Sequence, residues 1–230
     1  MTNAKQAAGR RAAEFVTPGS TVGLGTGSTV LYTLQRLGER IGSEGLEIRG
    51  VPTSLDTERK ARELGIPLVG LDEVSSIDLT IDGADEIDGD FDMIKGGGGA
   101  LLREKVVASI SEREVIVVGR AKVVERLGLG FLLPVEVVPF ARPVVSRALA
   151  KLGAQPTLRL ADAGVPTVTD NGNHILDCRY PKGIPDAAAL EGAIGRIPGV
   201  VESGLFVGLA HAVVIGDEDG AVEVREKPVG

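Results

Sequence analysis

The sequence contains no tryptophan, and its 230 residues include only five phenylalanines and two tyrosines. Proteins that bind single-stranded nucleic acid stack bases on aromatic side chains, and those that bind duplexes present clustered lysine and arginine. This chain carries a net charge of −7 and has no basic block. We therefore expect no nucleic-acid partner.

Long hydrophobic runs are also missing. A membrane-spanning helix needs roughly 18 or more consecutive apolar residues, and no segment reaches that length. The first residues are polar and mixed, so they lack the apolar centre of a signal peptide. The single cysteine, Cys178, excludes an internal disulfide. These features predict a cytoplasmic protein without a membrane partner, in which Cys178 is a small buried hydrophobic residue.

Glycine, in contrast, is abundant, with 32 residues, and the first two-thirds of the chain alternate between strand-like and helix-like segments. This alternation predicts an open, mostly parallel Rossmann-like sheet with helices on both faces, an α/β fold. The expected strands are 21–24, 46–51, 67–69, 77–81, 114–119, 212–215 and 221–224. The expected helices are 4–16, 31–41, 54–64 and 100–111.

A second pattern begins after about residue 128. Its segments come close to the order βαββαβ, with one additional strand-like segment, which predicts a small ferredoxin-like α+β domain inserted before the last strands. The expected strands are 135–138, 156–160, 165–169, 174–178 and 200–206, with helices over 141–152 and 186–196. We therefore assign residues 1–128 together with 207–230 to the α/β body and 129–206 to the small domain.

The first segment whose residues could bind a ligand is Gly23-Leu24-Gly25-Thr26-Gly27-Ser28-Thr29, between a strand and a helix. Glycines expose backbone amides, hydroxyls add donors and a helix N-terminus favours anions, so this segment predicts a phosphate cradle. The alternative is a simple turn in which Ser28 or Thr29 caps the helix. The segment is not a P-loop because no lysine follows it. A dinucleotide site would need an acidic residue after the next strand, where Pro52-Thr53-Ser54 stands instead.

The second segment is Asp82-Gly83-Ala84-Asp85-Glu86-Ile87-Asp88, which places four acidic residues directly after an apolar strand. Such carboxylates can transfer protons or bind sugar hydroxyls. A metal site and a solvated acidic turn are the alternatives. The spacing does not fit the calcium loop of an EF-hand.

The third segment runs from Lys95 through four consecutive glycines to Glu104 and Lys105. Four glycines are costly to order, which indicates that their bare amides are needed. A fixed cation beside a carboxylate suits enolisation: the carboxylate removes a carbon-bound proton and the cation stabilises the resulting oxyanion. The alternative for Glu104 is a surface glutamate favoured near a helix N-terminus.

No histidine, cysteine or carboxylate cluster has the spacing of a zinc site. His174 and His211 stand among apolar or strand-like residues, and we expect both to be structural.

Together these segments resemble ribose-5-phosphate isomerases of the A type. The shared motifs are GxGTGST at 23–29, DGADEID at 82–88 and KGGGGALLREK at 95–105, followed by LPVEVVPFA, VTDNGNHILD and IPGVVESGLF at 133–141, 168–177 and 197–206. The resemblance implies the interconversion of ribose 5-phosphate and ribulose 5-phosphate through a cis-enediolate, in the pentose phosphate pathway and the Calvin cycle. It also implies a homodimer or homotetramer that needs no cofactor or metal.

The resemblance also implies roles for individual residues. Glu104 matches the general base, and Asp82 matches a carboxylate that assists ring opening or moves protons between sugar oxygens. Asp85 matches a supporting acid, and Lys95 matches the cation that holds the substrate. The remaining substrate-binding positions are Thr26, Gly27, Ser28, Thr29, Gly83, Ala84, Gly96, Gly97, Gly98 and Lys122. Lys5 matches a lysine that contacts phosphate.

Three other functions compete with this interpretation. A nucleotide-dependent oxidoreductase would need an acidic ribose ligand, and a sugar-phosphate-sensing regulator would need a DNA-binding helix and a basic face. A coenzyme A transferase would use a catalytic glutamate on a related fold but would require an acyl donor. A nucleotide- or sugar-phosphate-binding module without isomerase activity remains the general alternative.

Overall fold

The computed structural model describes residues 2–227, which form two compact units, each built from separated stretches of chain. Of the described residues, the first unit comprises 2–84, 103–123 and 209–227, and the second comprises 85–102 and 124–208. Relative to the predicted domain bounds, segments 85–102, 124–128 and 207–208 lie with the second unit. Segment 85–102 carries two short strands that pair with each other, and the strand at 93–94 also pairs with one at 205–206.

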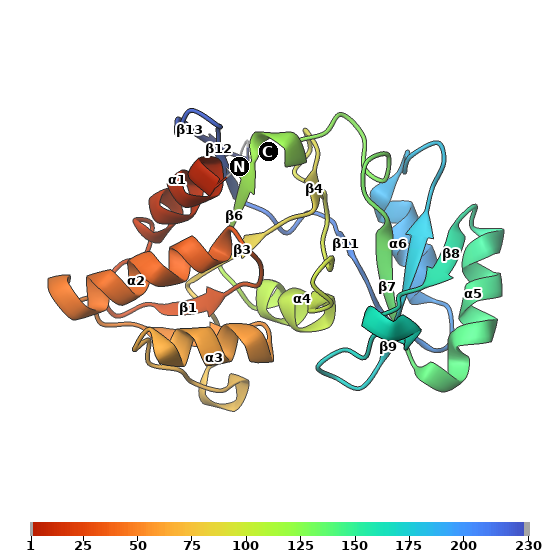
Figure 1. Cartoon of the computed structure of the whole chain (residues 1–230), viewed down its shortest axis with the longest axis horizontal. Coiled ribbons are helices and arrows are strands. Elements are labelled where there is room, and N and C mark those ends of the chain that lie inside the picture. Colours follow the sequence, from red (N-terminus) through yellow and green to blue (C-terminus); the bar gives the residue numbers. More distant parts are fainter. Residues whose placement is uncertain (1, 228–230) are drawn as a thin grey trace. The chain divides into compact units, whose positions relative to one another are not determined.

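A six-stranded sheet forms the centre of the first unit (Figure 1). Its strands lie in the order β13-β12-β6-β3-β1-β2, and all neighbours are parallel except β12 and β13. The strands are β1 (Thr21–Leu24), β2 (Arg49–Pro52), β3 (Leu79–Gly83), β6 (Glu114–Gly119), β12 (Ala212–Gly216) and β13 (Val222–Glu226). The chain therefore adds strands in one direction from β1 to β2 and in the other from β3 onward. This reversal lies between β1 and β3, and open α/β sheets bind ligands at such a point.

Helices cover both faces of this sheet. They are α1 (Thr2–Ala13), α2 (Val30–Glu44), α3 (Leu55–Glu63) and α4 (Leu101–Ser109), which begins in the second unit. Alternate strand residues, such as Val22 and Leu24 of β1, pack with α1 and α2 in one apolar cluster. On the opposite face, Val107 of α4 packs with Val51 and Ile77. The alternation follows from the two-residue period of side chains along a strand.

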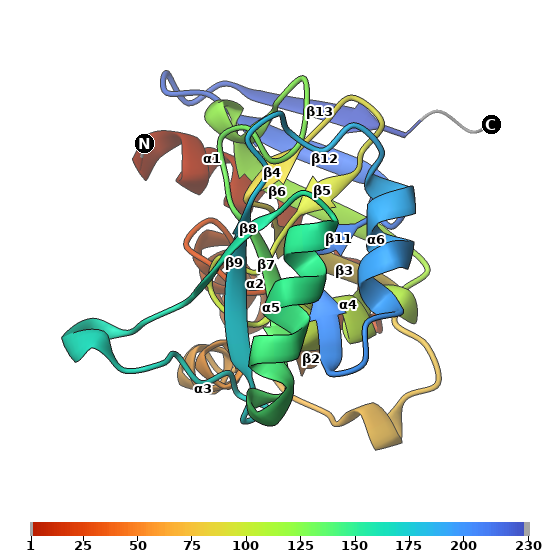
Figure 2. The ribbon, with the colours of Figure 1, turned by 90° about the vertical axis from the view of Figure 1, so that its right-hand side faces the viewer.

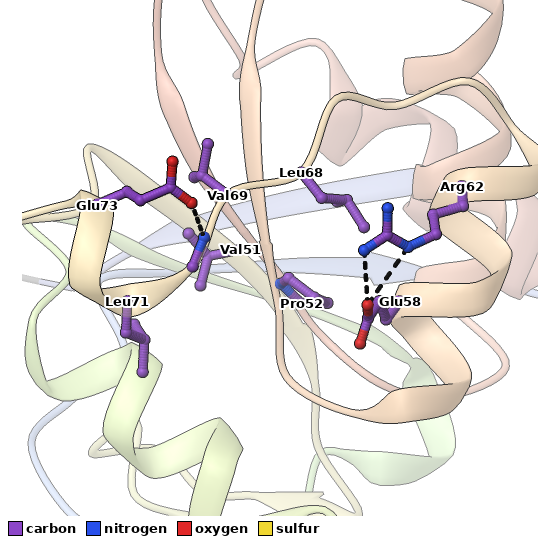
Figure 3. Close-up of a pocket in the computed structure, with 9 residues that line it drawn as sticks. Val51, Pro52, Glu58, Arg62, Leu68, Val69, Leu71 and Glu73 are labelled. Atoms are coloured by element: carbon purple, nitrogen blue, oxygen red, sulfur yellow. Dashed lines mark hydrogen bonds and ion pairs between the residues drawn. The ribbon is translucent and has the colours of Figure 1, made fainter.

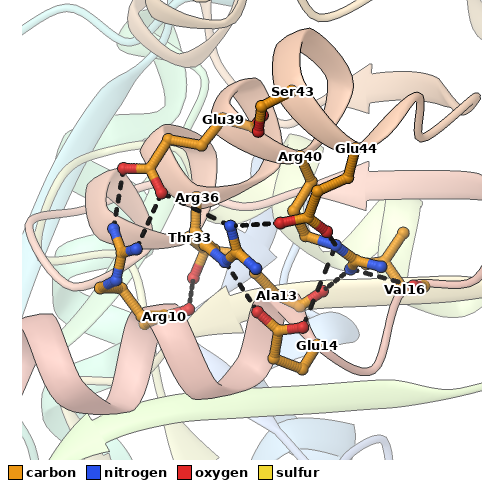
Figure 4. Close-up of polar contacts among 11 residues, drawn as sticks. Arg10, Ala13, Glu14, Val16, Thr33, Arg36, Glu39, Arg40, Ser43 and Glu44 are labelled. Carbon is orange, nitrogen blue, oxygen red and sulfur yellow. Dashed lines mark hydrogen bonds and ion pairs between the residues drawn. The ribbon is translucent and has the colours of Figure 1, made fainter.

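The packing of α1 against α2 positions the first helix beside the loop after β1. Gly9 makes this approach possible, since a Cβ there would lie 2.6 Å from the carbonyl oxygen of Thr29. An ion-pair network continues the contact (Figure 4): Arg10 binds Glu39 through two hydrogen bonds of 2.8 Å, and Arg36 lies 2.7 Å from Glu14. Single exposed pairs contribute little, about 0–1 kcal/mol each, so the apolar contacts dominate.

The second unit has a four-stranded antiparallel sheet in the order β10-β7-β9-β8. Its elements in chain order are β7 (Leu133–Val137), α5 (Arg142–Lys151), β8 (Gln155–Leu158), β9 (His174–Arg179), α6 (Ala187–Gly195) and β10 (Val200–Ser203). This is the predicted βαββαβ arrangement. Helices α5 and α6, which lie toward the viewer in Figure 2, cover one face of the sheet and share its apolar core. A smaller sheet joins β4 (Glu86–Ile87), β5 (Met93–Ile94) and β11 (Leu205–Phe206).

Several predicted elements differ in the structure. Segment 67–69 forms only an isolated bridge from Leu68 to Gly50, and segment 165–169 forms only bridges through Pro166 and Val168. The single strand predicted over 200–206 is interrupted at Gly204 and becomes β10 and β11. Within residues 2–227, no helix combines the length and the apolar character needed to cross a bilayer.

Candidate active site

The first two predicted motifs meet where β1 and β3 end. The amide of Gly25 donates to the carbonyl oxygen of Ile81 at 3.0 Å, which continues the pairing of the two strands by one residue. The amides of Thr26 and Gly83 then donate to Oδ1 of Asp82, at 3.0 and 2.7 Å. Asp82 is fully buried. Its carboxylate is therefore held in one orientation by the backbone of both motifs.

Glycine at position 25 is a steric requirement of this contact. A Cβ on Gly25 would lie 2.2 Å from Oδ1 of Asp82 and 2.5 Å from its Cα. Gly27 has a φ of +124°, a backbone conformation that favours glycine. The loop is therefore shaped for a close approach of backbone to the buried carboxylate, which a general strand-to-helix turn does not need.

The hydroxyl of Thr26, predicted to bind substrate, lies in a cluster of four hydroxyls. Its Oγ1 is 2.8 Å from the hydroxyls of Thr53 and Ser54 and 3.2 Å from that of Thr57. The side chain of Ser54 also accepts the Thr57 amide and thereby caps the N-terminus of α3. The sequence had not indicated Thr53 or Thr57 as support for this loop, because only the fold brings them to Thr26.

Lys5 reaches the same loop from α1. Its Nζ donates to Oγ of Ser28 at 2.9 Å, although the two residues are far apart in the sequence. Ser28 and Gly27 are exposed. Thr29 precedes α2, and its side chain forms no capping hydrogen bond within the described chain. The loop thus presents backbone amides, hydroxyls and an ammonium group at a helix N-terminus, which is the chemistry that binds phosphate.

Two further predicted residues belong to the first unit. Lys122 lies in the short 3-10 turn Arg120–Lys122 directly after β6, at the carboxyl edge of the sheet where β1 and β3 also end.

Glu104 lies in the first turn of α4 and is only 5% exposed. Val107, three residues later on the same side of α4, faces the sheet, since its Cγ1 would lie only 2.8 Å from a Cβ added to Gly23 of β1. Glu104 is therefore a buried residue, and the alternative of a surface glutamate is wrong.

In the second unit, Asp85 binds the glycine-rich loop. Its Oδ2 accepts the Gly97 amide at 2.7 Å, while its own amide donates to the carbonyl oxygen of Ile94 at 2.8 Å. A Cβ on Gly97 would lie 2.8 Å from both carboxylate oxygens of Asp85. The structure thus joins the acidic segment to the glycine loop.

Lys95 is 2% exposed, which is unusual for a lysine. Its backbone amide donates to the carbonyl oxygen of Gly204 at 2.8 Å, and its Nζ lies 5.3 Å from the centre of the Phe206 ring. A Cβ on Gly204 would lie 2.3 Å from the Lys95 carbonyl oxygen, so this contact also requires glycine. The β5–β11 pairing consequently fixes the start of the glycine loop.

Arg159 is a contact of this loop that the sequence did not indicate. Its Nη1 donates to the carbonyl oxygens of Gly96 and Gly97, both at 3.0 Å. A lone arginine beyond a short strand carries no motif, so only the structure identifies it.

The other two acidic residues of the DGADEID segment have structural roles. Glu86 is buried and accepts the amides of Gly128 and Gly130 at 2.6 and 2.8 Å. Asp88 accepts the amides of Asp90 and Asp92, and its burial raises its pKa above the usual value. No group of three or more potential ligands among residues 2–227 is arranged to hold a metal ion.

A cavity of about 310 Å³ lies elsewhere in the first unit (Figure 3). Its apolar wall comes from the end of β2 and from segment 68–71. The ion pair between Glu58 and Arg62 of α3 also lines it. None of the predicted site residues lines it.

The predicted burial of Cys178 is confirmed. Cys178 is fully buried among apolar residues, which raises the pKa of its thiol to about 12. His174 begins β9, and Nδ1 of His211 accepts the backbone amide of Glu114 at 3.0 Å.

Comparison with known proteins agrees with this geometry. Residues 49–220 match the family model described as ribose 5-phosphate isomerase A (phosphoriboisomerase A). A ribose-5-phosphate isomerase A of Gloeobacter violaceus is 54% identical over 221 residues, covering 96% of this chain and 94% of that protein. The solved ribose 5-phosphate isomerase of Plasmodium falciparum is 38% identical with a TM-score of 0.95 and full coverage of both chains.

Another solved structure is a D-ribose-5-phosphate isomerase in complex with phospho-erythronic acid. It is 37% identical, has a TM-score of 0.93 and covers 96% of this chain and 97% of its own. These matches extend over both units. The chain therefore belongs to the ribose 5-phosphate isomerase A family, whose members are aldose–ketose isomerases.

Proposed function

We propose that this chain interconverts D-ribose 5-phosphate and D-ribulose 5-phosphate. The observation that carries the proposal is its similarity to ribose-5-phosphate isomerases over nearly the whole length of both chains. The buried carboxylates and the glycine loops support it, since they supply the groups that an enolisation needs. We place the reaction in the non-oxidative branch of the pentose phosphate pathway and the protein in the cytoplasm.

The reaction moves hydrogen within one molecule. In the open-chain aldose, Glu104 removes the proton from C2, and the electron pair forms the C1–C2 double bond of a cis-enediolate. Protonation at C1 by Glu104, with transfer of the hydroxyl proton from the C2 oxygen to the C1 oxygen, completes the ketose. The substrate is both oxidised at C2 and reduced at C1, so the balanced reaction requires no external redox partner. The cofactor-free reaction is part of the proposal.

Asp82 is assigned the transfer of protons between sugar oxygens, including ring opening. Its Oδ1 is held by the amides of Thr26 and Gly83, which leaves the carboxylate in a fixed orientation as the sugar changes. A positioned acid or base of this kind typically accelerates a reaction by about 10²–10⁴-fold.

We assign to Lys95 and the glycine loop the stabilisation of the negative charge that develops on the substrate oxygen. Because the Gly97 amide already donates to Asp85, the Gly98 amide is the donor of the loop that we assign to the substrate, together with Lys95 at the start of the loop. Stabilising this charge is essential, since a carboxylate alone is far too weak a base for a proton on carbon.

The phosphate is assigned to the loop containing Gly27, Ser28 and Thr29 together with Lys5. The ligand of the related structure, phospho-erythronic acid, carries a phosphate at one end and a carboxylate at the other. The carboxylate of this ligand carries a negative charge like that of the enediolate oxygen. The ligand therefore combines the phosphate and the anionic group that the proposed site should bind.

The proposal is tested with purified protein treated with EDTA and mixed with ribose 5-phosphate while ribulose 5-phosphate is measured. Glu104→Gln is expected to keep the fold and to lose activity by about 10²–10⁴-fold. Glu112→Gln, the same substitution at an exposed position shortly after α4, serves as the matched control and should remain active.

Each outcome decides between the proposal and its main alternative. Inactivity of folded wild-type protein would leave a sugar-phosphate- or nucleotide-binding module, to be examined by binding of the same compounds. Activity retained in Glu104→Gln would remove Glu104 as the base but not the isomerase function. The proposed homodimer or homotetramer is tested separately by light scattering of the purified protein.

A further inference from the structure

Arg159 has a geometry that the reaction as described above does not use. It follows β8, and its amide donates to the carbonyl oxygen of Ile175 on β9 at 2.9 Å. Leu176 and Cys178 of β9 pack into the core with α5 and α6, so Ile175 and Asp177 lie on the opposite face. Arg159 and Asp177 meet on that face, where both side chains are mostly buried, at 16% and 17% exposed.

All three nitrogens of the guanidinium are engaged. Nε donates to Oδ2 of Asp177 at 2.8 Å and Nη2 donates to Oδ1 at 2.5 Å, which is a two-pronged ion pair. Nη1 donates to the carbonyl oxygens of Gly96 and Gly97. Only arginine has a rigid planar group with donors in this arrangement, and lysine cannot reproduce it.

Holding two consecutive carbonyls fixes two peptide planes. In a trans peptide the carbonyl and the following N–H point in opposite directions. The Gly96 carbonyl therefore directs the Gly97 N–H away from Arg159, and that N–H donates to Asp85. By the same geometry, the Gly97 carbonyl directs the Gly98 N–H away from Arg159. The arginine thus binds the carbonyl side of the loop and turns its amides to the other side.

The glycine loop needs such a support. Fixing the backbone of one residue costs about 1–2 kcal/mol, and glycine loses more freedom than any other residue. Gly96 and Gly99 also have positive φ values of 96° and 83°. A cation on the carbonyl oxygens further polarises the peptide groups and strengthens their N–H donors.

We propose that Arg159, held by Asp177, is a positioning residue that orients the Gly98 amide toward the negative charge of the enediolate and the Gly97 amide toward Asp85. This inference rests on the proposed isomerase function and extends it to a residue that does not touch substrate. Misplacing catalytic donors by about 1 Å can cost up to 10²-fold in rate. The loss should fall on kcat rather than on KM, because the phosphate loop supplies affinity separately.

The test compares Arg159→Ala, Arg159→Lys and Asp177→Asn with wild type. We expect kcat to fall by roughly 10–100-fold in Arg159→Ala with little change in KM, and to fall less in the other two variants. Guanidinium ion at millimolar concentration should restore part of the kcat of Arg159→Ala. Arg10→Ala, which breaks a similar two-pronged pair between α1 and α2, is the matched control and should keep wild-type kcat.

A binding measurement separates positioning from general structure. Phospho-erythronic acid carries the carboxylate, whereas erythritol phosphate has the same carbon chain with an alcohol in its place. Arg159→Ala and Arg159→Lys should bind the acid about tenfold or more weakly and the alcohol nearly as well as wild type does. Non-additive losses in the double variant Arg159→Ala/Asp177→Asn would show that the two residues act as one unit.

Three results would overturn the proposal. They are an unchanged kcat in Arg159→Ala, an equal loss of affinity for both ligands, or failure of both Arg159 variants to fold. Each would assign Arg159 to general stability of the second unit. If wild type itself fails to isomerise ribose 5-phosphate, the proposed function fails instead, and the difference in ligand affinity still reports whether Arg159 orients an anion-binding loop.

Discussion

The backbone amide of Thr26 donates to Oδ1 of Asp82 at 3.0 Å, which joins two motifs that lie 56 residues apart in the sequence. The contact occurs where β1 and β3 are neighbours in the parallel sheet. Because Thr26 directly precedes the residues that we assign to phosphate, a change in this carboxylate should also affect that loop. Substitutions of Asp82 can separate the effect of its charge on activity from the effect of its hydrogen bonds on stability.

Asp82→Asn should lower kcat by about 10²-fold while leaving the protein folded. The asparagine carbonyl can still accept both amides, but it can neither carry the charge nor transfer a proton. Asp82→Ala removes the acceptor as well and should cost a further 1–3 kcal/mol or so of unfolding free energy. Steady-state kinetics and urea unfolding measure the two effects, and Asp90→Asn, at an exposed position two residues after the acidic segment, is the control. Equal stability of the Ala and Asn variants would contradict the structural half of this prediction.

Gly25→Ala should destabilise the protein by about 1–3 kcal/mol and reduce activity. The new Cβ would lie 2.5 Å from the Cα of Asp82, so the strand ends must separate or the carboxylate must turn. Gly42→Ala is the matched control in the same unit, because nothing lies within 4 Å of a Cβ at that position of α2. Alanine favours helix there, so Gly42→Ala should stabilise by up to about 1 kcal/mol. Urea unfolding of the two variants gives opposite signs if the close approach is real.

Much of this site could be predicted because its signals are local. The order of strands and helices follows from hydrophobic periodicity, and the glycine runs mark loops whose backbone must be bare. The N-cap of α3 at Ser54 is equally local, since the capping side chain and its amide partner lie three residues apart. Such features depend on a few neighbouring residues and are therefore visible in the sequence.

The rest depends on residues that are distant in the sequence. Strands β4, β5 and β11 have two residues each, which is too short for a periodic pattern, and they exist because 93–94 pairs with 205–206. Thr53 and Thr57 support Thr26 only after β2 is placed beside β1. The hydrophobic pattern of segment 67–69 favoured a strand, but beyond the edge strand β2 it forms only one bridge.

Lys5→Ala should raise KM for ribose 5-phosphate by roughly 10-fold with kcat little changed. A hydrogen bond from a charged donor is worth about 1.5–3 kcal/mol, and binding energy lost equally from substrate and transition state appears in KM. Inorganic phosphate should likewise become a weaker competitive inhibitor. Lys151→Ala, an exposed lysine in the second unit, controls for the loss of one positive charge. A fall in kcat at constant KM would instead place Lys5 in the chemical step.

Arg120→Ala should weaken the fold at neutral pH and have progressively less effect as the solution becomes acidic. Arg120 donates to both carboxylate oxygens of Asp217, at 2.9 and 2.8 Å, and to Glu223 at 2.6 Å. Hydrogen bonds from Arg225 and Arg120 lower the pKa of Glu223 from 4.5 to about 2, and Arg120 lowers the pKa of Asp217 as well. A carboxyl whose folded pKa is lowered stabilises the fold above its unfolded pKa and loses that contribution as pH falls through its folded pKa.

The difference in thermal midpoint between wild type and Arg120→Ala should therefore be constant above about pH 5, shrink below it and vanish near pH 2. These side chains are exposed, so the difference should be small and should decrease in high salt. Arg179→Ala, at an exposed position of β9, controls for the change in net charge. A difference that grows as pH falls has the opposite sign and would mean that the arginine acts on the fold by packing rather than through the two carboxylates.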